Sequence, residues 1–189
     1  VDQFIDRTFA REKSFFGDGL VAHVSMAQPT CNRLAELAHE CAQKAKFPVR
    51  MGGTYLAMEG PQFSSLAESK LYRSWGCDVI GMTNMPEAKL AREAEICYVT
   101  IAMVTDFDCW HPDHDHVQVA DIVRVLLENS EKAKALVAMI APRLKADRPA
   151  PCPAGCDHAL EHALITSPAV RSAEMVTRLD AVAGRVLKK

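Results

Sequence analysis

Apolar positions recur along the chain with two different periods, and these periods predict its helices and strands. Segments with apolar residues three and four positions apart are typical of helices that cover a core. They fall at residues 30–46, 64–75, 86–95 and 117–144. Shorter segments that are β-rich or alternate at every second residue indicate strands. They fall at residues 21–26, 50–58, 79–82 and 96–104.

Strands that alternate with helices predict an α/β fold. The segment 96–104 is apolar without a break, which is typical of a strand in a sheet covered on both sides. We therefore expect a mixed, largely buried β-sheet flanked by helices on both faces, in a three-layer sandwich. The whole chain, 1–189, is expected to belong to one domain. Its core is residues 1–144, followed by a Pro/Ala-rich linker at 145–156 and two short C-terminal helices within 157–189.

Composition excludes some classes of protein. The apolar share is 49% and the formal net charge is −2, with acids and bases mixed along the chain. A nucleic-acid-binding protein needs a basic face to neutralise phosphates, so we expect no nucleic-acid partner. No apolar run approaches the length of a membrane span, so we expect no membrane partner. Five of the seven cysteines occur singly in apolar segments, which favours small buried thiols in a reducing cytoplasm.

Two carboxylates, Asp106 and Asp108, follow the apolar segment 96–104 directly. In α/β sheets, ligands bind beyond the carboxyl ends of strands. If the chain stays extended there, both side chains face the same way, and one acid can hold a proton while the other accepts hydrogen bonds. The alternative is a solvated acidic turn, which the spacing alone favours because Asp is common in turns.

Two further segments end predicted strands with polar or aromatic side chains. Thr83 and Asn84 come just before a predicted helix, where free N–H groups favour anions, although ordinary helix capping explains them equally well. Phe63 follows a Gly-Pro turn, where an aromatic ring can stack on a flat base. The alternative, favoured by frequency, is a phenylalanine of the core.

These segments carry a resemblance to a known family. The sequences MEGPQFSSLAES at 58–69, WGCDVIGMT at 75–83, PEAKLA at 86–91 and AMVTDFDCW at 102–110 resemble motifs of the methylthioadenosine phosphorylases, in the same order. This family is similar to the trimeric purine nucleoside phosphorylases. The resemblance covers residues 1–144 and implies phosphorolysis of the N-glycosidic bond of 5'-methylthioadenosine, with inorganic phosphate as co-substrate and no cofactor.

The resemblance also implies roles for residues around the purine. Asp106 would bind purine N7 and the 6-amino group and donate a proton as the base leaves, and Asp108 would assist at the 6-amino group. Thr105 and Phe63 would contact the substrate beside them. Because a carboxylate accepts from a 6-amino group but faces the lone pairs of a 6-oxo group, adenine is expected over hypoxanthine. A methylthioinosine or purine nucleoside phosphorylase is the alternative.

Other positions match residues around the ribose, phosphate and methylthio groups. By resemblance, Met82 contacts the ribose, Thr83 binds phosphate, and His23 reaches into the site of a neighbouring subunit of a homotrimer. The apolar residues expected around the methylthio group are Val119, Ile122 and Val123, which plain helix packing explains as well. The hypothesis requires the Asp106 carboxyl to lie beside a cavity that admits a purine.

By the same resemblance, the family's glycine-rich phosphate loop, a phosphate-binding arginine and a second histidine lie upstream of Val1. We therefore expect a separate N-terminal fragment to supply the phosphate loop, or else an inactive chain.

Two clusters have the residue types of metal sites. Residues 111–116 contain three His and two Asp, but neighbouring ligands rarely converge alone, and the resemblance implies a polar lid. The other cluster is Cys152-x₃-Cys156-x-His158-x₃-His162, for which we rank free thiols first, a disulfide second and zinc third. No metal site is expected.

Overall fold

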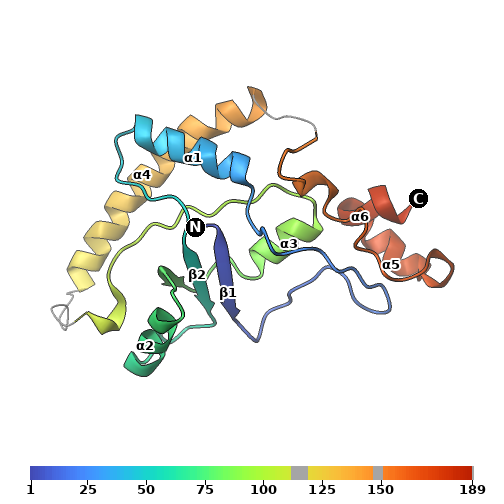
Figure 1. Ribbon diagram of the computed structural model, residues 1–189, viewed down its shortest axis with the longest axis horizontal. Coiled ribbons are helices and arrows are strands. Elements are labelled where there is room, and N and C mark those ends of the chain that lie inside the picture. Colours follow the sequence, from blue (N-terminus) through green and yellow to red (C-terminus); the bar gives the residue numbers. More distant parts are fainter. Residues whose placement is uncertain (112–118, 147–150, 189) are drawn as a thin grey trace.

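The structure is a computed structural model that describes residues 1–111, 119–146 and 151–188 (Figure 1). The side chains of residues 119–122 and 145–146 are not described. The described residues form three strands, β1 (Gln3–Arg7), β2 (Thr54–Met58) and β3 (Val79–Gly81). The helices are α1 (Asn32–Lys44), α2 (Leu66–Ser74), α3 (Glu87–Glu93), α4 (Val119–Ala146), α5 (Ala173–Arg178) and α6 (Asp180–Leu187). Short 3₁₀ turns lie at Asp108–Trp110, Cys156–His158 and Pro168–Val170.

The strands form a parallel sheet in the order β1-β2-β3, with Phe4 opposite Tyr55 and Tyr55 opposite Val79. The chain crosses from β1 to β2 through α1 and from β2 to β3 through α2. The predicted α/β class is therefore confirmed. These three strands are all parallel, and β2 is the most buried of them. Because parallel strands point the same way, the loops after all three strands meet at one edge.

One predicted strand is wrong. Residues 96–104 form no strand in the structure, although Tyr98 O accepts a bond from the Cys31 N–H at 2.8 Å. A strand needs a neighbouring ladder to pair its backbone groups, and none of the described strands runs beside this segment. Ile96 and Val104 are accordingly 58% and 59% exposed. The predicted strand at 21–26 is also reduced to one bridge, between Ala22 and Leu164.

The helix predicted at 117–144 is confirmed as α4, which packs on α1 (Figure 1). Leu37 and Cys41 of α1 share a buried cluster with Leu136 and Ile140 of α4. This cluster accounts for the apolar spacing that the sequence shows in both helices.

The C-terminal segment is less regular than predicted. Instead of two helices at 157–165 and 169–187, it forms turns followed by α5 and α6. It has its own buried cluster, to which Leu20 from the N-terminal part contributes. The cluster contains Leu20, Leu160, Ala163, Met175, Leu179, Ala183, Val186 and Leu187. The division into core, linker and C-terminal helices stays a prediction, and residues 147–150 of the linker lie outside the described residues.

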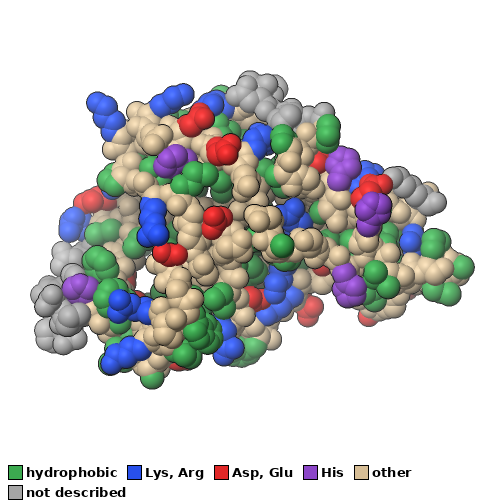
Figure 2. All heavy atoms as spheres, viewed as in Figure 1, with side chains coloured by type: hydrophobic (Ala, Val, Ile, Leu, Met, Phe, Trp, Pro, Cys, Tyr) green, Lys and Arg blue, Asp and Glu red, His purple; other side chains and the backbone are tan. Residues whose placement is uncertain are grey.

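The surface agrees with the mixed charge pattern of the sequence. Acidic and basic side chains are interspersed over the face shown in Figure 2, without a large area of one sign. Among the helices that the structure describes, none has both the length and the apolar character that a bilayer span requires.

Candidate active site

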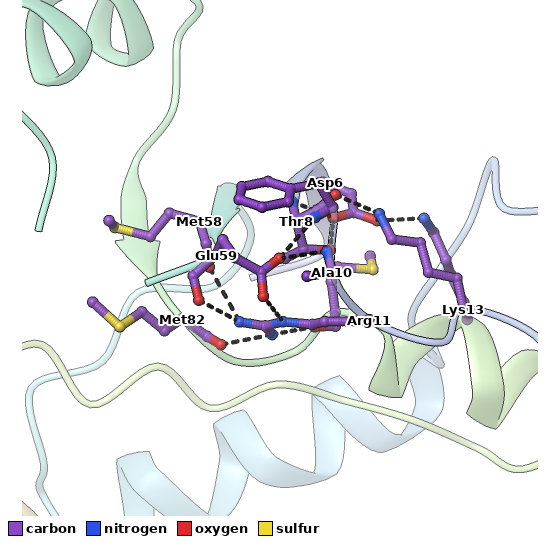
Figure 3. Close-up of polar contacts among 11 residues, drawn as sticks. Asp6, Thr8, Ala10, Arg11, Lys13, Met58, Glu59 and Met82 are labelled. Atoms are coloured by element: carbon purple, nitrogen blue, oxygen red, sulfur yellow. Dashed lines mark hydrogen bonds and ion pairs between the residues drawn. The ribbon is translucent and has the colours of Figure 1, made fainter. Parts of the chain in front are cut away.

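The loops after β1 and β2 meet at Arg11, which joins three segments at the carboxyl ends of the strands (Figure 3). Its guanidinium donates to the Glu59 carboxylate at 3.1 Å and to the Glu59 carbonyl at 2.9 Å. It also donates to the carbonyls of Met82, at 2.8 Å, and Met85. One half-buried cation thus satisfies carbonyls in the loops that follow β2 and β3.

Glu59 completes this contact from the other side. Its carboxylate accepts from the backbone N–H groups of Phe9, at 2.7 Å, and Ala10, at 3.2 Å. Hydrogen bonds from the Phe9 N–H, the Ala10 N–H and the Arg11 side chain hold the pKa of Glu59 below its usual value. The bond from the Phe9 N–H has the largest effect. The Glu59-Gly60-Pro61 turn is therefore fixed to the loop after β1.

Asp6, at the end of β1, holds a second set of contacts at this edge (Figure 3). It accepts from the Thr8 hydroxyl at 2.6 Å, from Lys13 Nζ at 3.0 Å and from Lys89. Burial alone would raise the pKa of Asp6, but Lys89, Thr8 and Lys13 outweigh it and hold the pKa well below its usual range. We call Asp6, Thr8, Arg11, Lys13, Glu59 and Lys89 the strand-end network.

Met82 and Thr83 follow β3 beside this network. The Tyr55 hydroxyl lies 3.2 Å from Thr83 Oγ1 and accepts from the Thr83 N–H at 3.4 Å. A Cβ atom on Gly81 would lie 1.9 Å from that hydroxyl, so this strand position requires glycine. Met82 Sδ would lie 2.6 Å from a Cβ on Gly60, which brings Met82 against the Gly-Pro turn.

Asn84 does not cap the following helix, as one interpretation of the sequence expected. It has a positive φ of 71°, and its Oδ1 accepts from Tyr98 Oη and Thr100 Oγ1, both at 2.8 Å. No side chain caps the N-terminus of α3. Asn84 instead holds the segment 96–104 against the end of β3.

Phe63 is not a core residue, because it is 85% exposed. It lies between the Gly-Pro turn and Ser65, which begins α2 in a capping box with Glu68. An exposed aromatic ring at this edge is free to contact a ligand or another protein surface. Its contact with a purine stays a prediction.

The loop that contains the two acids has both local and long-range bonds. Asp106 is exposed, and its carboxylate accepts from the Thr105 hydroxyl at 2.7 Å and from the Asp108 N–H at 2.9 Å. The chain is not extended here, because Asp108 has a φ of 59° and begins a 3₁₀ turn. Asp108 accepts from Ser69 Oγ at 2.6 Å, and Ser69 in α2 is 1% exposed. Asp108 is thus anchored to a buried residue, whereas Asp106 projects from the turn.

Other predicted site residues lie on other segments of the chain. His23 is exposed, and its backbone N–H bonds to Ala163 O at 2.8 Å, in the C-terminal segment. Val123 lies on α4 and is 46% exposed. Val119 and Ile122 belong to the same helix, but their side chains lie outside the described residues. The roles of these four residues stay predictions, as does most of the 111–116 cluster, since residues 112–116 are not described.

A cavity of about 520 Å³ lies elsewhere, between α1, α4 and the segments 47–52 and 99–104. Asp106, Thr83 and Phe63 are not among the residues that line it. The purine site at Asp106 therefore also stays a prediction.

The sequence analysis missed Arg11, Tyr55 and Ser69 as residues that position the site. Arg11 and Ser69 have no periodic pattern that marks them, and Tyr55 is indistinguishable from an ordinary strand residue. Arg11 does occur shortly after the end of β1, where ligand-binding loops gather, and Ser69 ends the motif at 58–69; these were the available signals.

The fold and this edge of polar residues match a known class of enzymes. The model of the Phosphorylase superfamily matches residues 1–141, and the chain belongs to this superfamily. Within it, the chain is 66% identical to the S-methyl-5'-thioadenosine phosphorylase of Rhodospirillum rubrum over 186 residues. That match covers 98% of this chain and 63% of the relative. The corresponding Cereibacter sphaeroides protein is 63% identical, with 100% and 64% covered.

Solved structures give the same result. A methylthioadenosine phosphorylase from an antarctic soil metagenomic library superimposes with a TM-score of 0.87 at 44% identity, over 96% of this chain and 63% of that one. A Schistosoma mansoni methylthioadenosine phosphorylase in complex with adenine gives a TM-score of 0.79 at 27% identity, over 87% and 64%. The chain therefore spans somewhat less than two thirds of the length of these relatives.

Proposed function

We propose that the chain forms part of an S-methyl-5'-thioadenosine phosphorylase, which converts its substrate and inorganic phosphate into adenine and 5-methylthioribose 1-phosphate. The observation that carries this proposal is the 66% identity to the Rhodospirillum rubrum enzyme over nearly the whole chain. The polar edge supports it, because the Thr83 hydroxyl lies in the loop beyond a parallel strand, where α/β enzymes bind ligands. An exposed acid and an anchored acid lie in the loop after residues 96–104.

In the proposed mechanism, Asp106 donates a proton to purine N7 as the N-glycosidic bond breaks. The proton neutralises negative charge on the departing base, while the ribosyl carbon passes through an oxocarbenium-like state and phosphate attacks the opposite face. Asp108 is anchored by buried Ser69, so its backbone N–H can orient Asp106 through their 2.9 Å bond. General-acid assistance of this kind is typically worth about 10²–10⁴ in rate.

Thr83 is proposed to contact phosphate, with its hydroxyl oriented by Tyr55 Oη at 3.2 Å. Phe63 and Met82 are proposed to contact the base and the ribose. We further propose a cytoplasmic homotrimer, in which a mixed sheet has helices on both faces and a separate N-terminal fragment supplies the phosphate loop. His23 would then serve the site of a neighbouring subunit; in this chain its backbone N–H bonds to Ala163 O in the C-terminal segment.

The proposal is tested by comparing kcat/KM for methylthioadenosine, methylthioinosine and inosine. The assay uses this chain alone and mixed with the part of the Rhodospirillum rubrum relative that the chain does not match. We expect phosphorolysis of methylthioadenosine in the mixture, and an Asp106→Ala variant reduced by about 10²–10⁴. Asp18→Asn, an exposed acid far from the loop, is the control and should leave kcat/KM unchanged. Equal use of inosine, or no phosphorolysis in the mixture, would refute the proposal.

A further inference from the structure

Four cysteines that are far apart in the sequence converge in the structure. Every pair of the Sγ atoms of Cys31, Cys97, Cys152 and Cys156 lies within 4.8 Å. Cys31 immediately precedes α1, Cys97 follows α3, and the other two belong to the C-terminal segment. The Sγ atom of Cys152 lies 3.9 Å from that of Cys31 and 3.6 Å from that of Cys97.

These separations are those of a tetrahedral thiolate site. With metal–sulfur bonds of about 2.3 Å, the four sulfur atoms of such a site lie about 3.8 Å from one another. We propose that these four cysteines bind one zinc ion per chain. This site lies apart from the acids of the candidate active site and does not depend on the proposed function.

The turn that carries Cys152 and Cys156 is built to present sulfur as an acceptor. Gly155 takes a positive φ of 67°, and its N–H bonds to Cys152 O at 2.8 Å, which closes the turn. The backbone N–H groups of Ala154 and Cys156 donate to the Cys152 sulfur. The Asp157 carboxylate accepts a hydrogen bond from the Cys152 N–H at 2.9 Å. Donors that point at sulfur stabilise a thiolate, which is the form that binds metal.

A cation offsets the charge of this cluster. Four thiolates around a divalent ion carry a net charge of −2, and the cluster is largely buried, with Cys31 and Cys156 at 0% and 2% exposure. The Arg33 guanidinium interacts with the sulfurs of Cys97 and Cys152. Its buried Nε has no hydrogen-bond partner within the part of the chain that the structure describes. An arginine in this place stabilises an anionic metal–thiolate centre.

The chemistry of the ligands selects the ion. Thiolates favour soft or borderline metals such as zinc, whereas calcium and magnesium require oxygen ligands. A disulfide engages two sulfurs at about 2.05 Å and leaves the convergence of the other two unexplained. The sequence suggested His158 and His162 as partners of Cys152 and Cys156, but the structure supplies Cys31 and Cys97 in their place. The expectation of no metal site is therefore replaced by this proposal.

Four protein ligands close the coordination sphere, so the ion would be structural. It would join the C-terminal segment to the start of α1 and to the segment after α3. The nearby contact of Arg185 with Glu95, at 2.6 Å, joins α6 to the same segment from another side.

The test is the metal content of the full chain, purified under reducing conditions and measured by inductively coupled plasma mass spectrometry. We expect one zinc per chain in the wild type and in Cys77→Ser, which alters a cysteine outside the cluster, and loss of the metal in Cys152→Ser. Replacement of the metal by Co²⁺ should give the visible ligand-field bands of a tetrahedral site and thiolate-to-cobalt charge-transfer absorption.

The cobalt spectrum needs no variant, so the proposal remains testable even if Cys152→Ser does not fold. If the wild-type chain contains no metal, the proposal is overturned, whether its cysteines are free thiols or form disulfides. Zinc retained in Cys152→Ser would overturn it as well. Because methylthioadenosine phosphorolysis is not measured in this experiment, its result is independent of the proposed function.

Discussion

Two regions of the candidate active site are held in different ways. The strand-end network joins residues far apart in sequence, such as Arg11 with Glu59 and Met82. In the loop at 105–110, the Asp106 carboxylate accepts hydrogen bonds from close neighbours, Thr105 and Asp108. The long-range anchors of this loop, Ser69 on Asp108 and Arg73 over the Trp110 ring at 3.5 Å, leave Asp106 itself exposed.

Because of this difference, we expect substitutions in the strand-end network to lower stability and substitutions of Asp106 to lower activity. Removal of a residue of the network leaves several buried carbonyls or charges without partners, so the cost falls on the fold. A change at Asp106 affects an exposed carboxylate and two local bonds, so its cost should fall on activity. The positions of Met82 and Thr83 are thus set by this chain, whereas the final position of Asp106 depends on what binds against the loop.

The largest effect on stability is expected for Arg11→Ala. Arg11 is 20% exposed at its side chain, and its loss leaves the carbonyls of Met82 and Met85 and the Glu59 carboxylate without this donor. The free energy of unfolding should fall by about 3 kcal/mol, as measured by denaturant titration. Arg50→Ala is the control, because Arg50 is 81% exposed in its pair with Asp78 and should cost about 1 kcal/mol or less. Equal costs would show that the network does not hold the strand ends.

A smaller effect, dependent on pH, is expected for Asp6→Asn. The folded pKa of Asp6 lies below its unfolded value, so the charged carboxylate stabilises the fold above about pH 4 and this contribution is lost as the pH falls further. Near neutral pH the variant should be less stable by about 2 kcal/mol. The difference between wild type and variant should shrink as the pH falls below about 4.

The measurement is a set of denaturant titrations at different pH, with Asp18→Asn as the control. Asp18 pairs with Arg178 at 3.3 Å but is 73% exposed, so its substitution should give a small difference that hardly changes with pH. A constant cost of Asp6→Asn across the acid range would contradict the assigned role of Lys89 and Lys13.

The smallest effect on stability is expected for Asp106→Asn. The amide oxygen of the variant can keep the bond from the Asp108 N–H, and the Thr105 hydroxyl can turn to accept from the amide NH₂, so the free energy of unfolding should change by no more than about 0.5 kcal/mol. Asp108→Asn sharpens the comparison, because it weakens the bond from buried Ser69 and should cost about 1 kcal/mol. A thermal melt of both variants measures this order. The reverse order would mean that the loop is anchored through Asp106.

The sequence predicted the regular parts of the fold because their signals are local. The apolar spacing of α1 and α4 reflects their shared cluster, and β2 and β3 fall within the predicted segments. The segment 96–104 was predicted wrongly because an apolar composition indicates buried side chains and does not show whether the backbone pairs with another strand. Whether such a segment becomes a strand depends on a neighbouring strand, which its own residues do not specify.

The candidate site was predictable in part for the same reason. Motifs placed Thr83 in the loop beyond β3 and Asp106 in a loop after an apolar segment, since the end of such a segment is visible in the pattern. Arg11 and the convergence of Cys31 and Cys97 with the C-terminal cysteines were not predictable, because each depends on contacts between segments remote in sequence. The spacing of Cys152 and Cys156 showed half of a possible site and gave no indication of its other half.

The buried cluster that includes Leu20 affects how the protein folds during its synthesis on the ribosome. Leu20 is 1% exposed, and its neighbours Val186 and Leu187 are translated more than 160 residues later. Since a growing chain folds from its N-terminus as it is made, Leu20 stays uncovered while these later residues are added. Newly made chains should therefore bind chaperones at this stretch until α6 has emerged and covers it.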